Sequence, residues 1–288
     1  MKNLITAVLV SSAIAQPLVA QGAWTAAVVP TDTAAAPTPF GPGEHLVYGV
    51  KLGIFNVGQG ALTVEGLDWV RGNPTYRVAM SMKGGKFGFS LDDRYTSWFD
   101  THTLQSWRFV RLYRGSYDSQ RHYEFYPERD LWDREDNDEF GPMPTDLPLD
   151  DIAFVYFLRT LPLNVGDHYT YDPARTPGGP AYFKNEGNPV TVDVVRKDRR
   201  KTDAGTFNTI VVRPSFQSEG LFSEDGEAEL HFTDDERRLL VYMKVDLPRF
   251  PGGISLHLRS IQEGFPVNPE SRAQALAARE ARRQTPRR

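Results

Sequence analysis

Apolar and polar residues alternate over short stretches along most of the chain, as expected for strands that place one face on a core. The clearest stretch runs from Tyr76 to Lys83, with apolar side chains at the even positions and mostly polar ones at the odd positions. Similar runs, bounded by Gly, Pro, Asn or Asp, occur at His45–Val50, Gly60–Leu67, Arg94–Phe99, Ser106–Tyr113, His122–Tyr126, His168–Tyr171, Val190–Arg196, Thr206–Arg213, Glu227–Phe232, Leu240–Val245 and Ile254–Arg259. Most gaps between runs are too short for crossover helices. We therefore expect a mainly β protein, a large curved antiparallel sheet or an incomplete flattened barrel.

One segment departs from this alternation and predicts a helix. Residues Leu149–Leu161 read LDDIAFVYFLRTL, with a proline before and after. Asp150 and Asp151 stand where a cap or a first-turn acid favours the positive end of the helix dipole. The segment is apolar nearly all round, which is typical of a buried helix. We expect it to pack against the concave face of the sheet or between two sheets.

The first residues have the pattern of a secretory signal peptide. Lys2 precedes the apolar run Leu4–Val10, and small residues suited to cleavage follow at Ala15 and Ala20. The run is shorter than the roughly 20 residues that span a bilayer, and no comparable run follows, so no transmembrane span is expected. The chain has no Cys, which excludes disulfides and the acylated cysteine of bacterial lipoproteins. We expect a soluble periplasmic or secreted protein without a lipid anchor.

Composition divides the rest of the chain. Residues 1–20 form the signal peptide, and residues 21–43, rich in Ala, Thr and Pro, predict a flexible linker. Residues 44–264 predict a single β-rich domain, with a split into two domains near residue 150 as the alternative. Residues 265–288 carry six Arg against two Glu, which predicts a basic tail that is disordered or a frayed helix and could touch anionic lipid. Because the whole chain has a net charge of −4 despite this tail, the body is acidic and nucleic-acid binding is not expected.

No catalytic or metal-binding motif is found. The nucleophile elbow, the P-loop, H-E-x-x-H and the dinucleotide-binding glycine pattern are all absent. The six His are scattered singly, and the acidic stretch Glu128–Glu139 fails the ligand spacing of a calcium-binding EF-hand. We expect no metal and no cofactor. An enzyme is the less favoured interpretation, although a hydrolase site assembled from dispersed Asp, Glu and His stays open.

Aromatic residues are the main resource for binding. Between Trp98 and Tyr126 they alternate with arginines, a surface that can stack on sugars or line an acyl-chain pocket. Cross-strand packing with arginine on the wet face explains the same pattern without a ligand. In the helix, Arg159 could instead satisfy the C-terminal carbonyls. The candidate ligand-binding residues are Met80, Met82, Trp98, Trp107, Tyr156 and Arg159.

Several stretches resemble a family of exported bacterial proteins, the domain of unknown function 3108 family. The stretches are Phe55–Gly60, Leu149–Arg159, Val165–Asp167, Ala204–Phe207 with Thr209–Val212, and Thr233–Asp235 before Leu239–Met243. Their order covers roughly residues 44–264. The resemblance implies an exported β-rich domain, and it supplies neither a reaction nor catalytic residues. The family is also similar in outline to curved-sheet periplasmic carriers of the lipoprotein-chaperone type.

These features lead to three functional hypotheses. The first is a non-catalytic envelope protein that holds a lipid, an acyl chain or a glycan in the concave face of its sheet. The second is a scaffold or assembly partner for other envelope proteins, which would use the sheet edges and the acidic stretch and would need no pocket. The third is the hydrolase with a dispersed site. An interior filled with side chains would argue against the first.

Overall fold

The computed structural model describes most of the predicted domain. The described residues are 21–23 and 38–265, apart from gaps at 87–88, 116–117, 144, 146, 172–179, 184–188, 216–227 and 248–249. The predicted signal peptide at 1–20 and the basic tail after residue 265 lie outside them. No helix in the described part of the chain is long and apolar enough to cross a membrane.

Fifteen strands form one sheet, in the order β1-β11-β13-β14-β15-β16-β17-β2-β3-β4-β5-β6-β7-β8-β9. The earlier strands are β2 (His45–Leu52), β3 (Phe55–Val70), β4 (Asn73–Lys86), β5 (Phe89–Asp100), β6 (Ser106–Gly115), β7 (Ser119–Tyr126), β8 (Leu131–Arg134) and β9 (Phe140–Pro142). The others are β1 (Gln21–Ala23), β11 (His168–Tyr171), β13 (Val190–Thr202), β14 (Gly205–Ser215), β15 (Ala228–Thr233), β16 (Leu240–Leu247) and β17 (Phe250–Gln262). Two short strands, β10 (Leu147–Leu149) and β12 (Pro180–Tyr182), pair separately, and one 3-10 turn, η1 (Pro127–Arg129), precedes β8.

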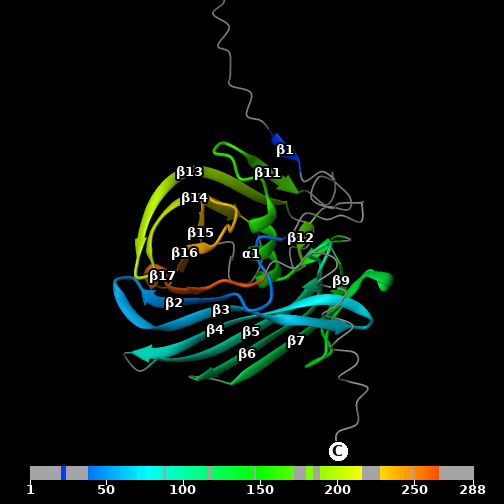
Figure 1. Cartoon of the computed structure of the whole chain (residues 1–288). Coiled ribbons are helices and arrows are strands. Elements are labelled where there is room, and N and C mark those ends of the chain that lie inside the picture. Colours follow the sequence, from blue (N-terminus) through cyan, green and yellow to red (C-terminus); the bar gives the residue numbers. More distant parts are fainter. Residues whose placement is uncertain are drawn as a thin grey trace, which may run out of the picture.

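The pairing confirms the predicted mainly β fold with one large antiparallel sheet. Strand β17 pairs with β2, so the early and late strands belong to the same sheet. The sheet is not closed into a barrel, because β1 and β9 stand at its two edges. Within this sheet all pairs are antiparallel except β1 with β11. Figure 1 shows the half from β13 to β17 curling above the half from β2 to β9.

The single helix of the described residues, α1 (Asp151–Thr160), lies inside this curve, as Figure 1 shows. The side chain of Asp150 caps it by accepting hydrogen bonds from the backbone N–H groups of Ile152 and Ala153 at 2.9 and 3.0 Å. The helix ends at Thr160, and its C-cap is Leu161, the residue before a proline. Every residue from Asp151 to Arg159 is buried, which explains why the segment is apolar nearly all round. The helix is confirmed, with bounds one or two residues inside the expected 149–161.

Side chains from the predicted alternating row meet this helix. Tyr76 and Val78 are fully buried and Met80 and Met82 nearly so, while Lys83 on the other face is largely exposed. The Tyr76 ring packs on Phe99, whose centroid lies 5.6 Å away on the neighbouring strand β5. The concave face of β4 and β5 and the helix therefore share one hydrophobic core.

The expected flexible linker over residues 21–43 is wrong for its last part. Phe40 is 2% exposed, and its ring packs edge-on against Tyr156 at 4.6 Å between centroids. The Thr38 hydroxyl lies 3.1 Å from that of Tyr76. Residues 21–23 form β1, and residues 24–37 lie outside the described part. Composition alone missed the single aromatic side chain that fixes this segment in the core.

A buried ion pair fixes the other end of α1. Arg159 donates to both carboxylate oxygens of Glu44 at 2.7 and 2.8 Å, and the two side chains are 0% and 3% exposed. The same guanidinium donates to the backbone carbonyls of Pro39 at 3.1 Å and Arg237 at 3.0 Å. The Tyr156 hydroxyl adds a bond to Glu44 at 3.3 Å. One side chain thus ties the helix to the segment before β2 and to the β15–β16 turn.

Removing this arginine should destabilise the fold far more than removing a surface cation. We expect Arg159→Ala to lower the free energy of unfolding by about 3–5 kcal/mol, because Glu44 is left as an unpaired buried charge. The matched control is Lys197→Ala, whose amine pairs with Asp234 at 2.7 Å but is 65% exposed, and it should cost less than about 1 kcal/mol. Urea denaturation followed by tryptophan fluorescence measures both. Equal losses for the two variants would contradict this role of Arg159.

Candidate functional site

The two helix residues expected to contact a ligand make contacts within the hydrophobic core instead. Arg159 and Tyr156 both point at Glu44 inside the core, and neither side chain is exposed. Arg159 is also not used for the helix C-terminal carbonyls, because its backbone partners are Pro39 and Arg237. Glu44, which was not among the predicted site residues, is the residue that organises this cluster. Its position as a single acid directly before β2 was the only local signal for it.

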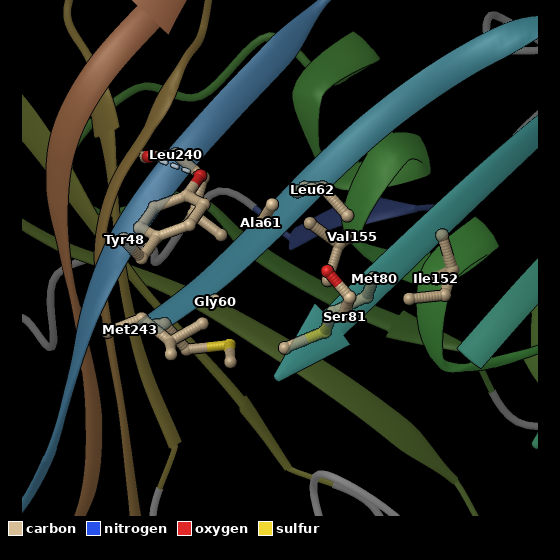
Figure 2. A pocket seen from close by; sticks show the side chains of 11 residues that line it. Tyr48, Gly60, Ala61, Leu62, Met80, Ser81, Ile152, Val155, Leu240 and Met243 are labelled. Atoms are coloured by element: carbon tan, nitrogen blue, oxygen red, sulfur yellow. Dashed lines mark hydrogen bonds between the residues drawn. The ribbon is translucent and has the colours of Figure 1, made fainter. Parts of the chain in front are cut away.

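A pocket beside α1 shows how little space remains on the concave face (Figure 2). Its lining comes from β2, β3, β4, α1, β16 and β17: Tyr48, Gly60, Ala61, Leu62, Met80, Ser81, Ile152, Val155, Leu240, Met243 and Leu256. The free volume is about 10 Å³, room for about one water molecule. Pockets for drug-sized ligands measure roughly 300–1,000 Å³. Met80 therefore lines a packing defect, and Met82 is buried in the same core.

The two tryptophans of the candidate set face away from α1. Trp98 lies between Arg77 on β4 and Arg108 on β6, its register partners, with guanidinium carbons 5.5 and 5.6 Å from the ring centroid. Trp107 sits at an irregularity in the β5–β6 register and lies near Arg71, at 5.6 Å. The structure thus separates these tryptophans from the methionines and the helix residues, and no single lining contains all six candidates.

The serines next to these tryptophans face inward and surround Asp150. Its Oδ2 accepts from the hydroxyls of Ser97 at 2.6 Å and Ser106 at 2.7 Å. The carboxyl group is completely buried, and burial raises its pKa to about 6 although the serine hydrogen bonds act in the opposite direction. The neighbouring Asp151 is paired with the buried Arg111. These acids organise the start of the helix.

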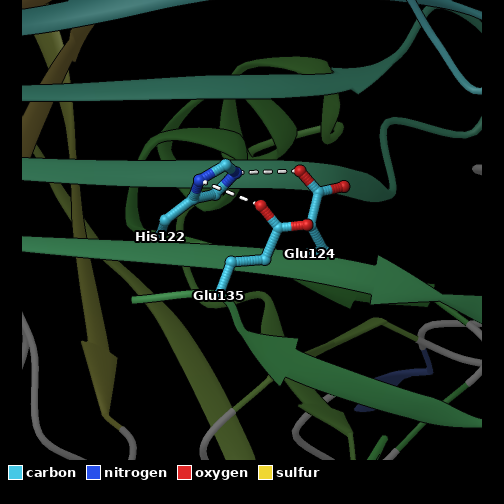
Figure 3. Close-up of side chains that lie close together, drawn as sticks. All are labelled: His122, Glu124 and Glu135. Carbon is cyan, nitrogen blue, oxygen red and sulfur yellow. Dashed lines mark hydrogen bonds and ion pairs between the residues drawn. The ribbon is translucent and has the colours of Figure 1, made fainter. Parts of the chain in front are cut away.

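A second cluster gathers His122, Glu124 and Glu135 on the other face of β7 and the loop after β8 (Figure 3). His122 Nε2 lies 2.9 Å from Glu124, and its Nδ1 lies 3.4 Å from Glu135. Arg71 and Arg108 also bind the Glu124 carboxylate. Burial acts to raise the pKa of Glu124, but hydrogen bonds from His122 and Arg108 outweigh it and the pKa is lowered. With two guanidinium groups already on the central carboxylate, the cluster fits an ion-pair network better than a cation site.

An open groove lies at the other end of the outer face, where the β2–β3 hairpin meets β16 and β17. Its volume is about 830 Å³. The lining residues are Lys51, Leu52, Gly53, Ile54, Phe55, Tyr242, Lys244, Gly252, Ser255 and His257. Burial and then the charges of Lys51 and Arg200 lower the pKa of His257 to about 4, although Asp203 acts in the opposite direction. The sequence analysis did not select this groove. The available signal was an apolar pair, Ile54 and Phe55, directly after the turn glycine Gly53.

The fold and these sites define a class of protein: one open, strongly curved antiparallel sheet wrapped around a single helix, with polar clusters on both faces. The sequence from 47 to 259 matches the model of a family described as protein of unknown function (DUF3108). The chain therefore belongs to this family, as the resemblance indicated. No curated protein matches the sequence.

Three solved structures match this chain in the comparison. A beta-barrel-like protein of the domain of unknown function DUF1849 from Brucella abortus is 10% identical, covers 80% of this chain and 100% of its own, and has a TM-score of 0.47. A candidate lipoprotein from Parabacteroides distasonis (10% identity, 79% and 99% coverage) has a TM-score of 0.34. A candidate exported protein with a YmcC-like fold from Bacteroides fragilis (9%, 79% and 99%) has a TM-score of 0.31.

The raised pKa of Asp150 predicts how stability depends on pH. Its folded-state pKa of about 6 lies above the ordinary value of 3.8, so ionisation disfavours the folded state. The contribution of this group is a loss of unfolding free energy, up to about 3 kcal/mol, as the pH rises from about 4 to above 6. In Asp150→Asn, which keeps a capping oxygen, this part of the pH dependence should disappear.

Chemical denaturation at a series of pH values between 4 and 7 measures this difference. The matched control is Asp138→Asn at an exposed position of the acidic loop, which should leave the pH dependence of unfolding unchanged. A wild-type slope retained in Asp150→Asn would show that another group causes it.

Proposed function

We propose that this protein is exported to the cell envelope and acts there as a non-catalytic binding and scaffolding protein, through its outer surface and not through its interior. The signal-peptide pattern at residues 1–20 supports export. The observation that carries the proposal is the filled concave face. Helix α1 occupies it, and the pocket left beside the helix measures about 10 Å³.

The buried polar groups near the helix support the same view. Glu44 and Arg159 bind each other, Asp151 binds Arg111, and Asp150 caps α1. Each of these charged groups is used to hold the helix, so none is aimed at a space that a substrate enters. A lipid or glycan in the concave face would have to displace α1 and break these contacts.

The acidic segment Glu128–Glu139, which includes β8 and the loop after it, offers a face for a protein partner together with the adjoining strand β9. At the end of β8, Arg134 pairs with Asp136 at 2.7 Å and with Glu139 at 2.8 Å, which gives the loop a defined shape. Asp138 remains exposed, and Phe140 beside it is 73% exposed at the edge of the sheet. An apolar anchor with an acidic rim suits a partner surface that carries basic residues. Because β9 is short and ends in Pro142, strand addition is not the expected mode.

Native mass spectrometry and site-specific crosslinking in cells test this function. We expect the mature protein, purified from its own envelope without detergent, to have the mass of the chain alone, because the pocket beside α1 has a free volume of only about 10 Å³. A photoreactive side chain in place of Phe140 should crosslink to another envelope protein. The same group in place of Val165, 49% exposed before β11, is the matched control and should give no such product.

Two results would contradict the proposal. A stoichiometric lipid or glycan that stays bound through purification would place the function in the interior. A cytoplasmic location of the chain with residues 1–20 uncleaved would remove the envelope assignment.

A further inference from the structure

We propose that the groove at the β2–β3 hairpin docks the protein on an anionic phospholipid bilayer, with Ile54 and Phe55 entering the interface and Lys51 and Lys244 facing lipid phosphates. This inference rests on the proposed function, since it names the lipid bilayer as a structure that the outer face of the protein binds in the envelope. It uses residues far from the Glu128–Glu139 loop, so the two can be tested separately.

The tip of this hairpin exposes apolar side chains in an unusual way. Ile54 is 87% exposed and Phe55 49% exposed. Among the large exposed hydrophobic residues of the described chain these two are the only adjacent pair. Turns normally carry polar residues, and a contiguous exposed apolar patch marks an interaction surface. Large apolar residues beside cationic ones are the pattern of proteins that lie in the membrane interface.

The tip is held in place by glycines near the start of β17. The backbone N–H of Gly53 donates to the carbonyl of Gly253 at 2.9 Å. A Cβ on Gly252, whose φ is +86°, would lie 3.0 Å from the Gly53 Cα. Glycine is therefore needed for this approach. A fixed tip presents Ile54 and Phe55 without a large loss of conformational entropy on binding.

Positive charge surrounds the same groove. Lys51, Ser255 and Lys244 are register partners across β2, β17 and β16, so the two lysines flank one serine on the outer face. Lys244 has a counter-ion in Asp246 at 2.8 Å, whereas Lys51 has no ion pair among the described residues. The Arg200 guanidinium carbon stacks 3.5 Å from the centroid of the Tyr242 ring.

Two other neighbouring acids are paired with arginines outside the groove lining. Glu229 pairs with Arg196 and Arg213, both at 3.0 Å, and Asp203 with Arg259 at 3.4 Å. The lowered pKa of His257, which burial and the charges of Lys51 and Arg200 cause, is consistent with a positive local potential. A surface with apolar side chains at its tip and basic residues behind them, of which Lys51 has no ion pair among the described residues, is complementary to an anionic lipid headgroup layer.

Vesicle co-sedimentation of the full mature chain tests the proposal. The probes are vesicles of phosphatidylcholine alone and of phosphatidylcholine with a quarter phosphatidylglycerol. We expect binding only to the second kind. Lys51→Gln should weaken it about fivefold, as expected for one cation near a charged bilayer, and Ile54→Ser about tenfold or more. Both positions are at the surface, so the thermal midpoints of the variants should stay close to that of the wild type.

Matched variants separate the groove from general effects. Phe140→Ser removes an aromatic residue that is 73% exposed, and Lys83→Gln removes an amine that is 74% exposed; neither should change vesicle binding. The basic tail is present in every variant, so differences between them report on the groove. In an Ile54→Trp variant, brominated phospholipid should quench the added fluorescence, and in Phe140→Trp it should not.

Three outcomes would overturn the inference. One is equal binding to the two kinds of vesicle, and another is an equal loss in the control variants. The third is binding of monomeric lysophosphatidylglycerol without binding to vesicles, which would make the groove a site for single lipids. The crosslink from position 140 is independent of all three, so failure here leaves the proposed function standing.

Discussion

A guanidinium group removed from water needs hydrogen-bond partners inside the protein, and Arg159 is such a group. Its partners are Glu44 and two backbone carbonyls, one from near the start of the domain sequence and one from near its end. At the other end of the helix, Asp150 and the pair of Asp151 with Arg111 meet the same requirement. The helix therefore has one position and one orientation within the sheet, and the aromatic core is arranged around it.

Because of this constraint, the accessible charged side chains lie on the outer surface of the molecule. Once the helix and its polar anchors occupy the concave face, the cations and acids that remain accessible lie on the convex face and at the edges. There, arginines stack on Trp98 across three strands, a buried carboxylate on β7 collects two arginines and His122, and the far hairpin combines apolar and basic side chains. The curved sheet acts as a support whose two ends carry different charge.

Local pattern was sufficient for the longer strands and for α1, and insufficient for the short strands β1, β8, β9, β10 and β12 and for the partners of each element. The alternation around Tyr76–Met82 and the prolines around α1 are properties of neighbouring residues, and both were predicted. The pair of Glu44 with Arg159 joins residues 115 apart in the sequence, which no local pattern encodes. The face on which Trp107 lies depends on a register irregularity in the β5–β6 pair, and one such shift reverses the side of the sheet to which a side chain points. Phe40 was missed because its neighbours are prolines and small residues.

The position of Arg159 also has a consequence for the order in which the molecule is assembled. Its guanidinium binds Pro39 and Glu44 near the start of the domain and Arg237 near the end, so its site is incomplete until almost the whole domain has been synthesised. Contacts of such sequence separation form late and slowly. For the export proposed above, this delay is an advantage, because the partly made domain lacks the contacts that would fix α1 in place.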